Sequence, residues 1–417
     1  MRRGLGLLVV IALLWAGAAP VAARPSWKRR IDRLAAGHSI GIAVAQDGRM
    51  VYRWASKARR VPASNQKLLT SMALLDTLGP DLRIATTAAS ATVRAGVVPG
   101  ALWVRGHGDP AVASPGRFAR SLPFPPTKVR RLARAIKAAG VRHIRGRVMG
   151  SRAYFRHDWN APGWKPYFRS LYVALPSALT FNGNVHKARH TAQPERLLAS
   201  KLTRRLLEIG VRVDGRPGSG QAPAGLRPVA RVRSRALSTL IRYMDRKSSN
   251  FFAEVLGKRL AVATSGAPGT IAGGARAIAA WTARHGVRAV AHDASGLSYR
   301  NRISARGLVR LLLRSQHEPW GRMLKESLPG PGQGTLEDRL AGVPVRAKTG
   351  TLTGVSALSG WVWRRRPGRW ATFSIMSRGL PKYRASAIED RVVRILAASG
   401  RRPGSMRLLG YVPRLLV

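Results

Sequence analysis

The apolar positions near the start of the chain predict a helix followed by a β-hairpin. Residues 26–36 carry apolar side chains at helical spacing, and residues 40–44 and 50–54 have the pattern of strands. Asp47-Gly48 lies between the two strand patterns, and this dipeptide favours the tight turns of hairpins. We therefore expect this part of the chain to contribute two antiparallel strands to a sheet.

The next apolar stripe follows Ser64, in the segment with the clearest candidate chemistry. Leucine and methionine at helical spacing predict a helix that ends at Gly79, with Ser64 and Lys67 on its first turn. Residues three apart on a helix are about 5–6 Å apart at Cβ, so the lysine amine reaches the serine hydroxyl. The amine takes the serine proton only when burial or a nearby cation destabilises its charged form. Taken alone, such a pair is more often a helix cap beside a solvated lysine.

The last part of the chain contains three predicted helices, then two strands around a turn at Pro367-Gly368, then a final helix. Strands near both ends of the chain with helices between them predict one antiparallel sheet assembled from the N- and C-terminal parts and flanked by helices, an α/β (α+β) fold. In order, these elements are helices over 234–246, 251–263 and 304–313, the last capped by Ser304, strands at 357–363 and 370–377, and a helix over 385–398.

A stretch with a different pattern of predicted elements separates these two parts. From about residue 86 to residue 232, short strands and loops accompany two helices, one with Thr127 as its N-cap and the other over residues 195–209. We therefore expect residues 24–85 and 233–400 to form one domain, and residues 86–232 to form a domain inserted into it.

The first 23 residues have the three parts of a secretory signal peptide. Met1-Arg2-Arg3 is basic, residues 5–15 are apolar, and small residues end at Ala23. We therefore expect residues 1–23 to be removed and the protein to be exported to the bacterial periplasm or cell-wall space. No later apolar stretch approaches the roughly 20 residues of a membrane span, so we expect no transmembrane anchor after cleavage, while peripheral membrane association stays open. The chain has no cysteine, so its fold depends on core burial without disulfides.

Basic residues outnumber acidic ones along the whole chain. The formal charge is 73 − 18 = +55, and residues 86–232 alone hold 26 basic and 5 acidic residues. Such a charge suggests a nucleic-acid partner, but export argues against one. Two interpretations stay open: a surface suited to anionic wall polymers or anionic lipid, and a compositional preference for arginine without functional meaning. Residues 401–417 form a basic and apolar tail to which the sequence assigns no role.

Lysine is rare in this chain, which makes its position informative. Only 13 of the 73 basic residues are lysine, and no lysine other than Lys67 has a serine three residues before it. Arginine does not lose its proton in proteins, so a lysine at this position is consistent with a need for a titratable amine.

Three motifs occur in a fixed order: Ser64-x-x-Lys67, Ser248-x-Asn250 and Lys348-Thr349-Gly350. Each is weak alone, since Ser248-Ser249-Asn250 is also a common helix cap and Lys348-Thr349-Gly350 a common strand end. In combination they are the signature of serine acyl-transferases that act on penicillins and on D-alanyl-D-alanine peptides.

The resemblance extends beyond these motifs. The chain resembles the D-alanyl-D-alanine carboxypeptidase/endopeptidase family, the class C low-molecular-mass penicillin-binding proteins. The resemblance extends over nearly the whole chain up to about residue 400. The stretches that carry it are residues 63–70, 106–110, 177–182, 293–298, 334–336 and 348–352. The resemblance implies a serine DD-peptidase/β-lactamase-like domain with a further domain inserted between the first and second motifs. Family members commonly carry another strand-rich domain after the segment that matches Phe181 to Asn184; here Pro194 and its helix follow within ten residues, so we expect that inner domain to be absent or vestigial.

The resemblance also implies a role for each motif residue. Ser64 attacks the carbonyl between two D-alanines, Lys67 accepts its proton, Ser248 relays a proton to the leaving amine, and Asn250 holds the peptide amide and Lys67. Lys348 and Thr349 bind the terminal carboxylate beside Gly350, because a charge-assisted hydrogen bond of about 1.5–3 kcal/mol distinguishes a free C-terminus from an amide. The backbone N–H groups of Ser64 and Thr351 form the oxyanion hole. The implied substrates are peptidoglycan stem peptides, with β-lactams as covalent inhibitors and no metal or cofactor.

Two other hypotheses remain. A β-lactamase-type hydrolase shares all three motifs but usually adds a carboxylate base for fast deacylation, and this chain has only 18 acidic residues. A non-catalytic, polycationic wall-binding protein built on an inactive enzyme is the other, although every motif residue is present.

Overall fold

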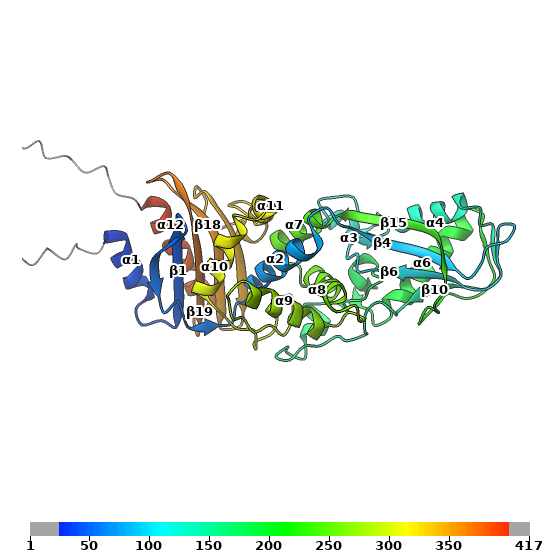
Figure 1. Cartoon of the computed structure of the whole chain (residues 1–417), viewed down its shortest axis with the longest axis horizontal. Coiled ribbons are helices and arrows are strands. Elements are labelled where there is room, and N and C mark those ends of the chain that lie inside the picture. Colours follow the sequence, from blue (N-terminus) through cyan, green and yellow to red (C-terminus); the bar gives the residue numbers. More distant parts are fainter. Residues whose placement is uncertain (1–24, 400–417) are drawn as a thin grey trace, which may run out of the picture.

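The computed structural model describes residues 25–399. The predicted signal peptide, residues 1–23, and the predicted tail, residues 401–417, lie outside the described residues. The described part is elongated, and Figure 1 shows a pair of helices, a first sheet, a layer of helices and a second sheet following one another along the long axis.

The first sheet joins strands from both ends of the chain. All neighbouring strands are antiparallel, and Ile40 pairs with Ser377 across more than three hundred residues of sequence. The predicted antiparallel sheet is therefore confirmed. In spatial order its strands are β17 (Val345–Leu352), β18 (Val355–Arg364), β19 (Arg369–Arg378), β1 (Ile40–Gln46) and β2 (Arg49–Trp54).

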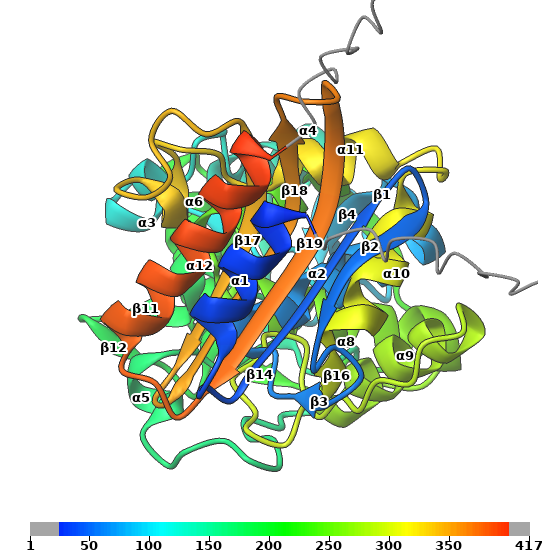
Figure 2. The same cartoon turned by 90° about the vertical axis from the view of Figure 1, so that its left-hand side faces the viewer.

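Alternation along β1 explains how this sheet is covered on both faces. Ile40, Ile42 and Val44 belong to the core beneath α1 (Ser26–Ala35) and α12 (Lys382–Ala398), whereas Ala43 and Ala45 belong to the core beneath the helical layer. Successive side chains of a strand point to opposite faces, so a fully buried strand supplies both cores. In Figure 2 α1 and α12 lie side by side in front of the sheet.

The helical layer holds α2 (Gln66–Leu78) at its centre. Leu68, Leu69, Met72 and Leu74 are all fully buried, so α2 is enclosed on every side. The Ser304 cap is confirmed, since its hydroxyl accepts a hydrogen bond from the Gly307 N–H at 3.0 Å. The other helices of the layer are α7 (Leu237–Lys247), α8 (Asn250–Ser265), α9 (Ile271–Arg284), α10 (Ala305–Ser315) and α11 (Gly321–Ser327).

The second sheet mixes parallel and antiparallel pairs. Its core contains only residues between Ala88 and Val232, supplied mostly by the strands and by α4 (Val129–Ala138) and α6 (Pro194–Glu208). In spatial order the strands are β14 (Gly218–Gly220), β10 (Val148–Ser151), β6 (Leu102–Gly106), β4 (Arg83–Ser90) and β15 (Arg227–Ala236).

Two predicted helix starts in this region are wrong. Thr127 does not cap α4: it lies in a short strand, and its hydroxyl donates to the buried carboxylate of Asp109 at 2.6 Å. Residues 234–236 belong to β15, so α7 begins at Leu237. In both cases pairing with a distant strand or carboxylate competes with the local helix signal.

The remaining elements are short. Among the described residues no helix is long and apolar enough to span a bilayer. These short elements are β3 (Arg59–Arg60), η1 (Ala63–Asn65), β5 (Val97–Val98), β7 (Val112–Ala113), α3 (Arg117–Ser121), β8 (Thr127–Lys128), β9 (His143–Ile144), α5 (Phe168–Leu171), η2 (Asn182–Asn184), β11 (Val185–His186), β12 (Arg189–His190), β13 (Arg212–Val213), β16 (Ile303–Ser304) and η3 (Gly334–Leu336).

Candidate active site

Ser64 lies on the 3-10 helix η1, one turn before α2. The expected first turn of an α-helix is therefore displaced, because Ala63 has a φ of +46° and regular α-helix begins only at Gln66. The loop that contains Gly296 packs closely against this turn, because a Cβ added to Gly296 would lie 1.9 Å from the Ala63 carbonyl oxygen. The buried Asn65 amide donates to the Ser359 hydroxyl of β18 at 2.8 Å and so attaches the turn to the sheet.

Lys67 is fully buried directly behind Ser64. Its Nζ lies 3.1 Å from Ser64 Oγ, 2.8 Å from Asn250 Oδ1 and 2.7 Å from the Ser295 carbonyl oxygen. A neutral amine that donates to Asn250 and Ser295 keeps its lone pair for the hydroxyl proton of Ser64. The contact between the first and second motifs is therefore direct.

The pKa of Lys67 is lowered to about 8. Burial is the largest cause, because desolvation disfavours the ammonium, while Asp293, Glu254 and Asp245 oppose it by favouring the charged form. A pKa in this range gives a general base that is partly neutral near neutral pH.

The third motif meets the second on the other side of the site. Ser248 has a left-handed backbone, with φ of 54°, at the end of α7, and its hydroxyl lies 2.9 Å from Lys348 Nζ. The Thr349 hydroxyl donates to Thr335 Oγ1 at 2.7 Å. Lys348 is buried, and burial together with the nearby Lys67 lowers its pKa, against the opposing effect of Asp245. Ser248 at the end of α7, Thr335 in η3, and Lys348 and Thr349 on β17 thus meet beside one cleft.

Gly350 allows β17 to lie against Ser64. A Cβ at Gly350 would lie 2.8 Å from the Pro62 carbonyl oxygen and 3.0 Å from the Ser64 nitrogen. The side-chain hydrogen that replaces it leaves room for the strand to pass beside the Ser64 N–H. Thr351, the next residue of β17, lines the same cleft as Ser64.

The cleft in front of Ser64 has a volume of about 630 Å³. Ser248, Asn250 and Thr351 line it beside Ser64, and Tyr167, Phe168, Tyr172 and Tyr299 supply aromatic surface. None of the described residues that line it is an aspartate or a glutamate. The structure thus brings Ser64, Ser248, Asn250 and Thr351 to one cavity, with Lys67 and Lys348 buried behind it.

Three buried acidic residues support the lysines, and the sequence motifs did not single them out. Glu254 accepts from the Ala294 and Ser295 N–H groups at 3.1 and 2.8 Å, which holds the Ser295 carbonyl towards Lys67. Asp293 organises the same loop by accepting from the Gly296 and Ser298 N–H groups. Asp293 lies in the stretch 293–298 that resembles the family, which was a signal for it, whereas Asp245 and Glu254 lie outside the similar stretches and are revealed only by their burial.

Asp245 is the third of these acids. It is fully buried and accepts from the hydroxyls of Ser71 and Ser327 at 2.9 and 3.0 Å. Burial raises its pKa to about 6, while Lys348 and Lys67 favour its charged form. Asp245 therefore contributes a negative charge behind both lysines of the site.

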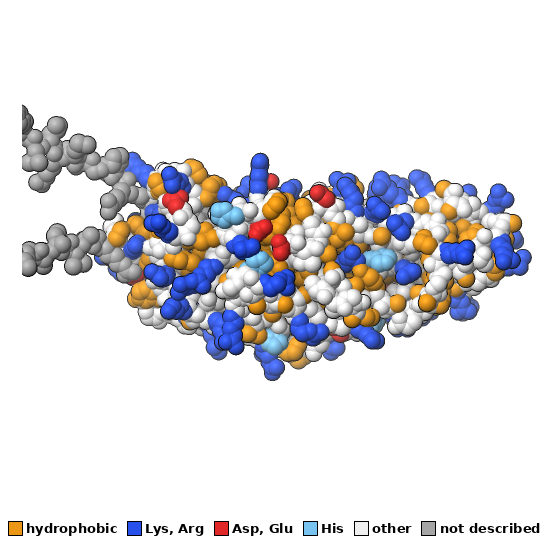
Figure 3. All heavy atoms as spheres, in the orientation of Figure 1, with side chains coloured by type: hydrophobic (Ala, Val, Ile, Leu, Met, Phe, Trp, Pro, Cys, Tyr) orange, Lys and Arg blue, Asp and Glu red, His pale blue; other side chains and the backbone are white. Residues whose placement is uncertain are grey.

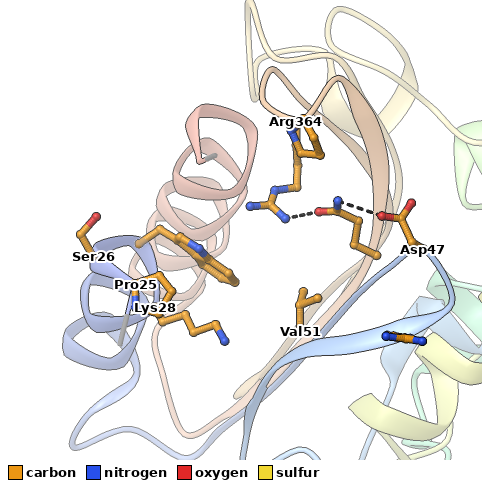
Figure 4. A pocket seen from close by; sticks show the side chains of 10 residues that line it. Pro25, Ser26, Lys28, Asp47, Val51 and Arg364 are labelled. Atoms are coloured by element: carbon orange, nitrogen blue, oxygen red, sulfur yellow. Dashed lines mark hydrogen bonds between the residues drawn. The ribbon is translucent and has the colours of Figure 1, made fainter. Parts of the chain in front are cut away.

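A larger cleft, of about 990 Å³, lies elsewhere, between α1, the β1–β2 hairpin and the β18–β19 turn (Figure 4). Arg364 there donates to Gln46, which in turn donates to Asp47 at 3.2 Å. No serine and lysine pair like that of Ser64 and Lys67 lines this cleft among the described residues. Within residues 25–399 no three His, Cys, Asp or Glu side chains gather into a metal-binding group.

Comparisons with known proteins agree with this geometry. The model of the D-Ala-D-Ala carboxypeptidase 3 (S13) family matches residues 29–195 and 184–399, two segments that meet at the β11–β12 hairpin. The chain is 28% identical over 382 residues to carboxypeptidase DacB of Mycolicibacterium smegmatis, covering 86% of this chain and 80% of that protein. It is 28% identical over 468 residues to the D-alanyl-D-alanine carboxypeptidase of an Actinomadura species, covering 89% and 84%.

A solved structure shows the same fold. Penicillin binding protein 4 from Haemophilus influenzae superposes with a TM-score of 0.76 at 19% identity, over 88% of this chain and 99% of that one. That protein has also been solved in complex with a β-lactam. The family match spans the three motifs and the sheet that carries them, so the chain belongs to the D-Ala-D-Ala carboxypeptidase 3 (S13) family and is a serine-type D-Ala-D-Ala carboxypeptidase.

Proposed function

We propose that Ser64 cleaves the terminal D-Ala-D-Ala bond of peptidoglycan stem peptides through an acyl-enzyme. Ser64 Oγ attacks the carbonyl carbon and its proton passes to Lys67. The C–N bond then breaks as Ser248 relays this proton from Lys67 to the departing amine, which leaves Lys67 neutral again. Water then attacks the ester and frees Ser64. Each step uses a side chain that lines the cleft or is buried directly behind it.

One observation carries this proposal: the buried Lys67 amine lies 3.1 Å from the Ser64 hydroxyl, with two other acceptors fixing its position. Asn250 supports the same arrangement, because its amide nitrogen donates to the Tyr172 carbonyl at 3.1 Å while its oxygen holds Lys67. The amide group of Asn250 also borders the cleft, where a peptide amide would pass.

Lys348 and Thr349 are the proposed binding site for the substrate's terminal carboxylate. The Lys348 ammonium and the Thr349 hydroxyl can donate hydrogen bonds to the carboxylate and so replace the water that it loses on binding. The N–H groups of Ser64 and Thr351 are the proposed oxyanion hole, in which removal of one donor typically costs roughly 2.7–4 kcal/mol of transition-state stabilisation. Gly350 supports this proposal because it lets the strand approach the Ser64 nitrogen.

Acylation by a β-lactam tests the proposal. Intact-mass measurement after incubation with a penicillin is expected to find one adduct per chain, mapped to Ser64. The Ser64→Ala variant should remain unmodified, and Ser121→Ala, an exposed serine on α3, should be modified like the parent protein. An adduct on Ser248, or acylation that survives Ser64→Ala, would refute the assignment.

The same acylation step can act on the end of a single stem peptide or on a D-alanyl cross-bridge between two stems. We propose carboxypeptidase action on single stems as the main reaction, with endopeptidase action on D-alanyl cross-bridges as a second one. A β-lactamase-type reaction has less support, because no carboxylate among the described residues lines the cleft to activate a deacylating water. A catalytically inactive wall-binding protein has less support too, because every motif residue is present.

We further propose that the exported chain is divided as expected from the sequence, with residues 86–232 inserted between residues 24–85 and 233–400. The separate core of the second sheet supports this division. The segment after Asn184 holds only the β11–β12 hairpin before α6, which is consistent with the loss of a further inner domain. Basic side chains are scattered over the visible face of the molecule in Figure 3 and outnumber the acidic ones there, and this supports retention among anionic wall polymers.

A further inference from the structure

A cleft of about 600 Å³ lies between α1 and α12, on the side of the first sheet away from Ser64. Arg30 and Arg33 of α1 and Arg391 and Arg394 of α12 line it. All four arginines are exposed, and the half-buried Leu34 and the buried Ile395 line the cleft between them. Two helices thus place four guanidinium groups around one apolar strip.

No acidic residue among residues 25–399 lines this cleft, and Asp32, on α1 between Arg30 and Arg33, accepts a hydrogen bond from the Tyr52 hydroxyl at 2.8 Å. No acidic residue in this part of the chain forms an ion pair with the four arginines of the cleft. Glu389 and Asp390, the nearest acids along α12, are both held by Arg339, at 2.9 and 2.7 Å. Four cations without an ion-pair partner line one cleft and repel one another, and an anionic partner would relieve that repulsion.

The neighbouring surface has the same character. The larger cleft at this end of the molecule (Figure 4) carries Lys28, Arg49 and Arg364. Its one acid, Asp47, lies 3.2 Å from Arg369. The two clefts adjoin α1 on either side. Cationic groups therefore surround α1 at this end.

We propose that the face formed by α1 and α12 docks on an anionic lipid surface, with Arg30, Arg33, Arg391 and Arg394 binding phosphate headgroups. Clusters of four or more Lys and Arg beside a membrane attract anionic lipid, at about tenfold or less in affinity per residue. Arginine suits this role because its planar group donates two parallel hydrogen bonds to phosphate oxygens.

The chain that follows α12 supplies the second element that membrane anchoring requires. Ala398, the last residue of α12, lines this cleft, and residues 400–417 follow Ser399 in the sequence. This segment contains no acidic residue, and its last ten residues include Leu408, Leu409, Leu415 and Leu416. One weak anchor gives only marginal membrane binding, whereas a basic patch combined with an apolar segment gives stable binding.

These apolar groups favour lipid over a soluble wall polymer as the partner. An anionic polymer would match the arginines but would leave the half-buried Leu34 and the leucines of the tail without a complementary surface. The tail itself is a poor occupant of the cleft, because Arg401, Arg402 and Arg407 would be brought against four like charges.

Docking of this face would give the enzyme a defined orientation. The first sheet separates α1 and α12 from the helical layer that holds α2, and Figure 1 shows the second sheet at the opposite end of the long axis. A membrane at the α1–α12 end would leave the second sheet at the end of the molecule away from the lipid.

Vesicle flotation tests the proposal, using the chain from residue 24 onward and phosphatidylcholine vesicles with or without phosphatidylglycerol. The parent protein should float only with the anionic vesicles. A variant with Arg30→Gln, Arg33→Gln, Arg391→Gln and Arg394→Gln should lose at least about tenfold in partition constant, since it removes four headgroup contacts. A variant with Leu408→Ser, Leu409→Ser, Leu415→Ser and Leu416→Ser should also bind more weakly.

A matched control separates this face from the general charge of the protein. Lys57, Arg59, Arg288 and Arg310 are exposed and line a different basic cleft, near β3 and α10. Replacing all four with glutamine removes the same charge and should weaken flotation less than threefold. Thermal melts should show that both glutamine variants remain folded.

The absence of cysteine permits a second, site-specific readout. An environment-sensitive fluorophore at Ala398→Cys, in the α1–α12 cleft, should shift to the blue with anionic vesicles, and one at Ala283→Cys, exposed on α9, should not. Equal losses in the two glutamine variants, or equal shifts at the two labels, would overturn the proposal. So would a parent protein that binds soluble polyphosphate through these arginines but does not float with vesicles.

Discussion

Replacing Lys67 with arginine separates the two roles that a lysine can have beside Ser64. Lys67 is fully buried and contacts Ser64, Asn250 and Ser295 at 3.1, 2.8 and 2.7 Å. Arginine keeps the positive charge and can donate to the same acceptors, but it does not accept a proton at any pH at which the protein is folded. The Lys67→Arg variant therefore retains the electrostatics and removes the base.

The expected size of the effect follows from the pKa of Lys67. With a pKa of about 8, about one tenth of Lys67 is neutral at pH 7 and about one hundredth at pH 6. Loss of a general base typically costs 10²–10⁴-fold in rate, so we expect Lys67→Arg to lower the acylation rate by at least about 10²-fold. The parent rate should rise about tenfold per pH unit below pH 8, because deprotonation creates the active form.

The assay is the second-order rate of reaction with a chromogenic cephalosporin between pH 6 and pH 9. The variant should show a low rate without the rise towards pH 8. Thermal melts establish that it is folded, and Lys67→Met, which has a side chain of similar length without an amine, provides a second variant if arginine does not fit the buried site. Lys57→Arg, at an exposed lysine away from the cleft, should leave the rate unchanged. A folded Lys67→Arg protein that acylates at near the parental rate would show that another group takes the serine proton.

Three further predictions concern substrate binding, charge and packing. Thr349→Val should reduce the preference for a free C-terminal carboxylate over an amide by about tenfold in kcat/KM, since one charge-assisted hydrogen bond is lost; an unchanged preference would remove Thr349 from the carboxylate site. Asp245→Asn should move the rise in acylation rate to lower pH, because Asp245 raises the pKa of Lys67, and an unmoved or opposite pH profile would contradict this. Gly296→Ala should lower the free energy of unfolding by at least about 2 kcal/mol in denaturant titrations, because its Cβ would overlap the Ala63 carbonyl at a φ of +88°. Gly286→Ala, with a φ of +68° but open space, is the control and should cost about 1 kcal/mol; equal losses would mean that the close approach is unimportant.

Local patterns in the sequence were sufficient for the elements whose stability depends on their own residues. The β1–β2 hairpin at Asp47-Gly48, the strands around Pro367-Gly368 and the Ser304 cap all follow from turn and capping chemistry. The three motifs, read directly from the sequence, then indicated the family, and the family match confirms it. These features need no knowledge of distant contacts.

Elements that depend on close contacts with distant segments were not predicted. Residues 271–284 form α9 although Gly273-Gly274 weakens a helix there, and the reason is packing: a Cβ at Gly274 would lie 2.5 Å from the Gly257 carbonyl oxygen of α8. Two helices approach this closely only where neither carries a side chain, and the sequence does not show which glycines will face each other.

What the sequence alone determined is which side chains are candidates for the reaction and the order in which they follow one another along the chain. Only the tertiary structure decided their chemical state. The pKa of Lys67 depends on how completely α2 is buried and on Asp293, Glu254 and Asp245, acids far away in sequence that the fold brings near it. Desolvation and Coulomb interactions act through space, so a lysine in a short motif becomes a base only after the sheet and helices have closed around it.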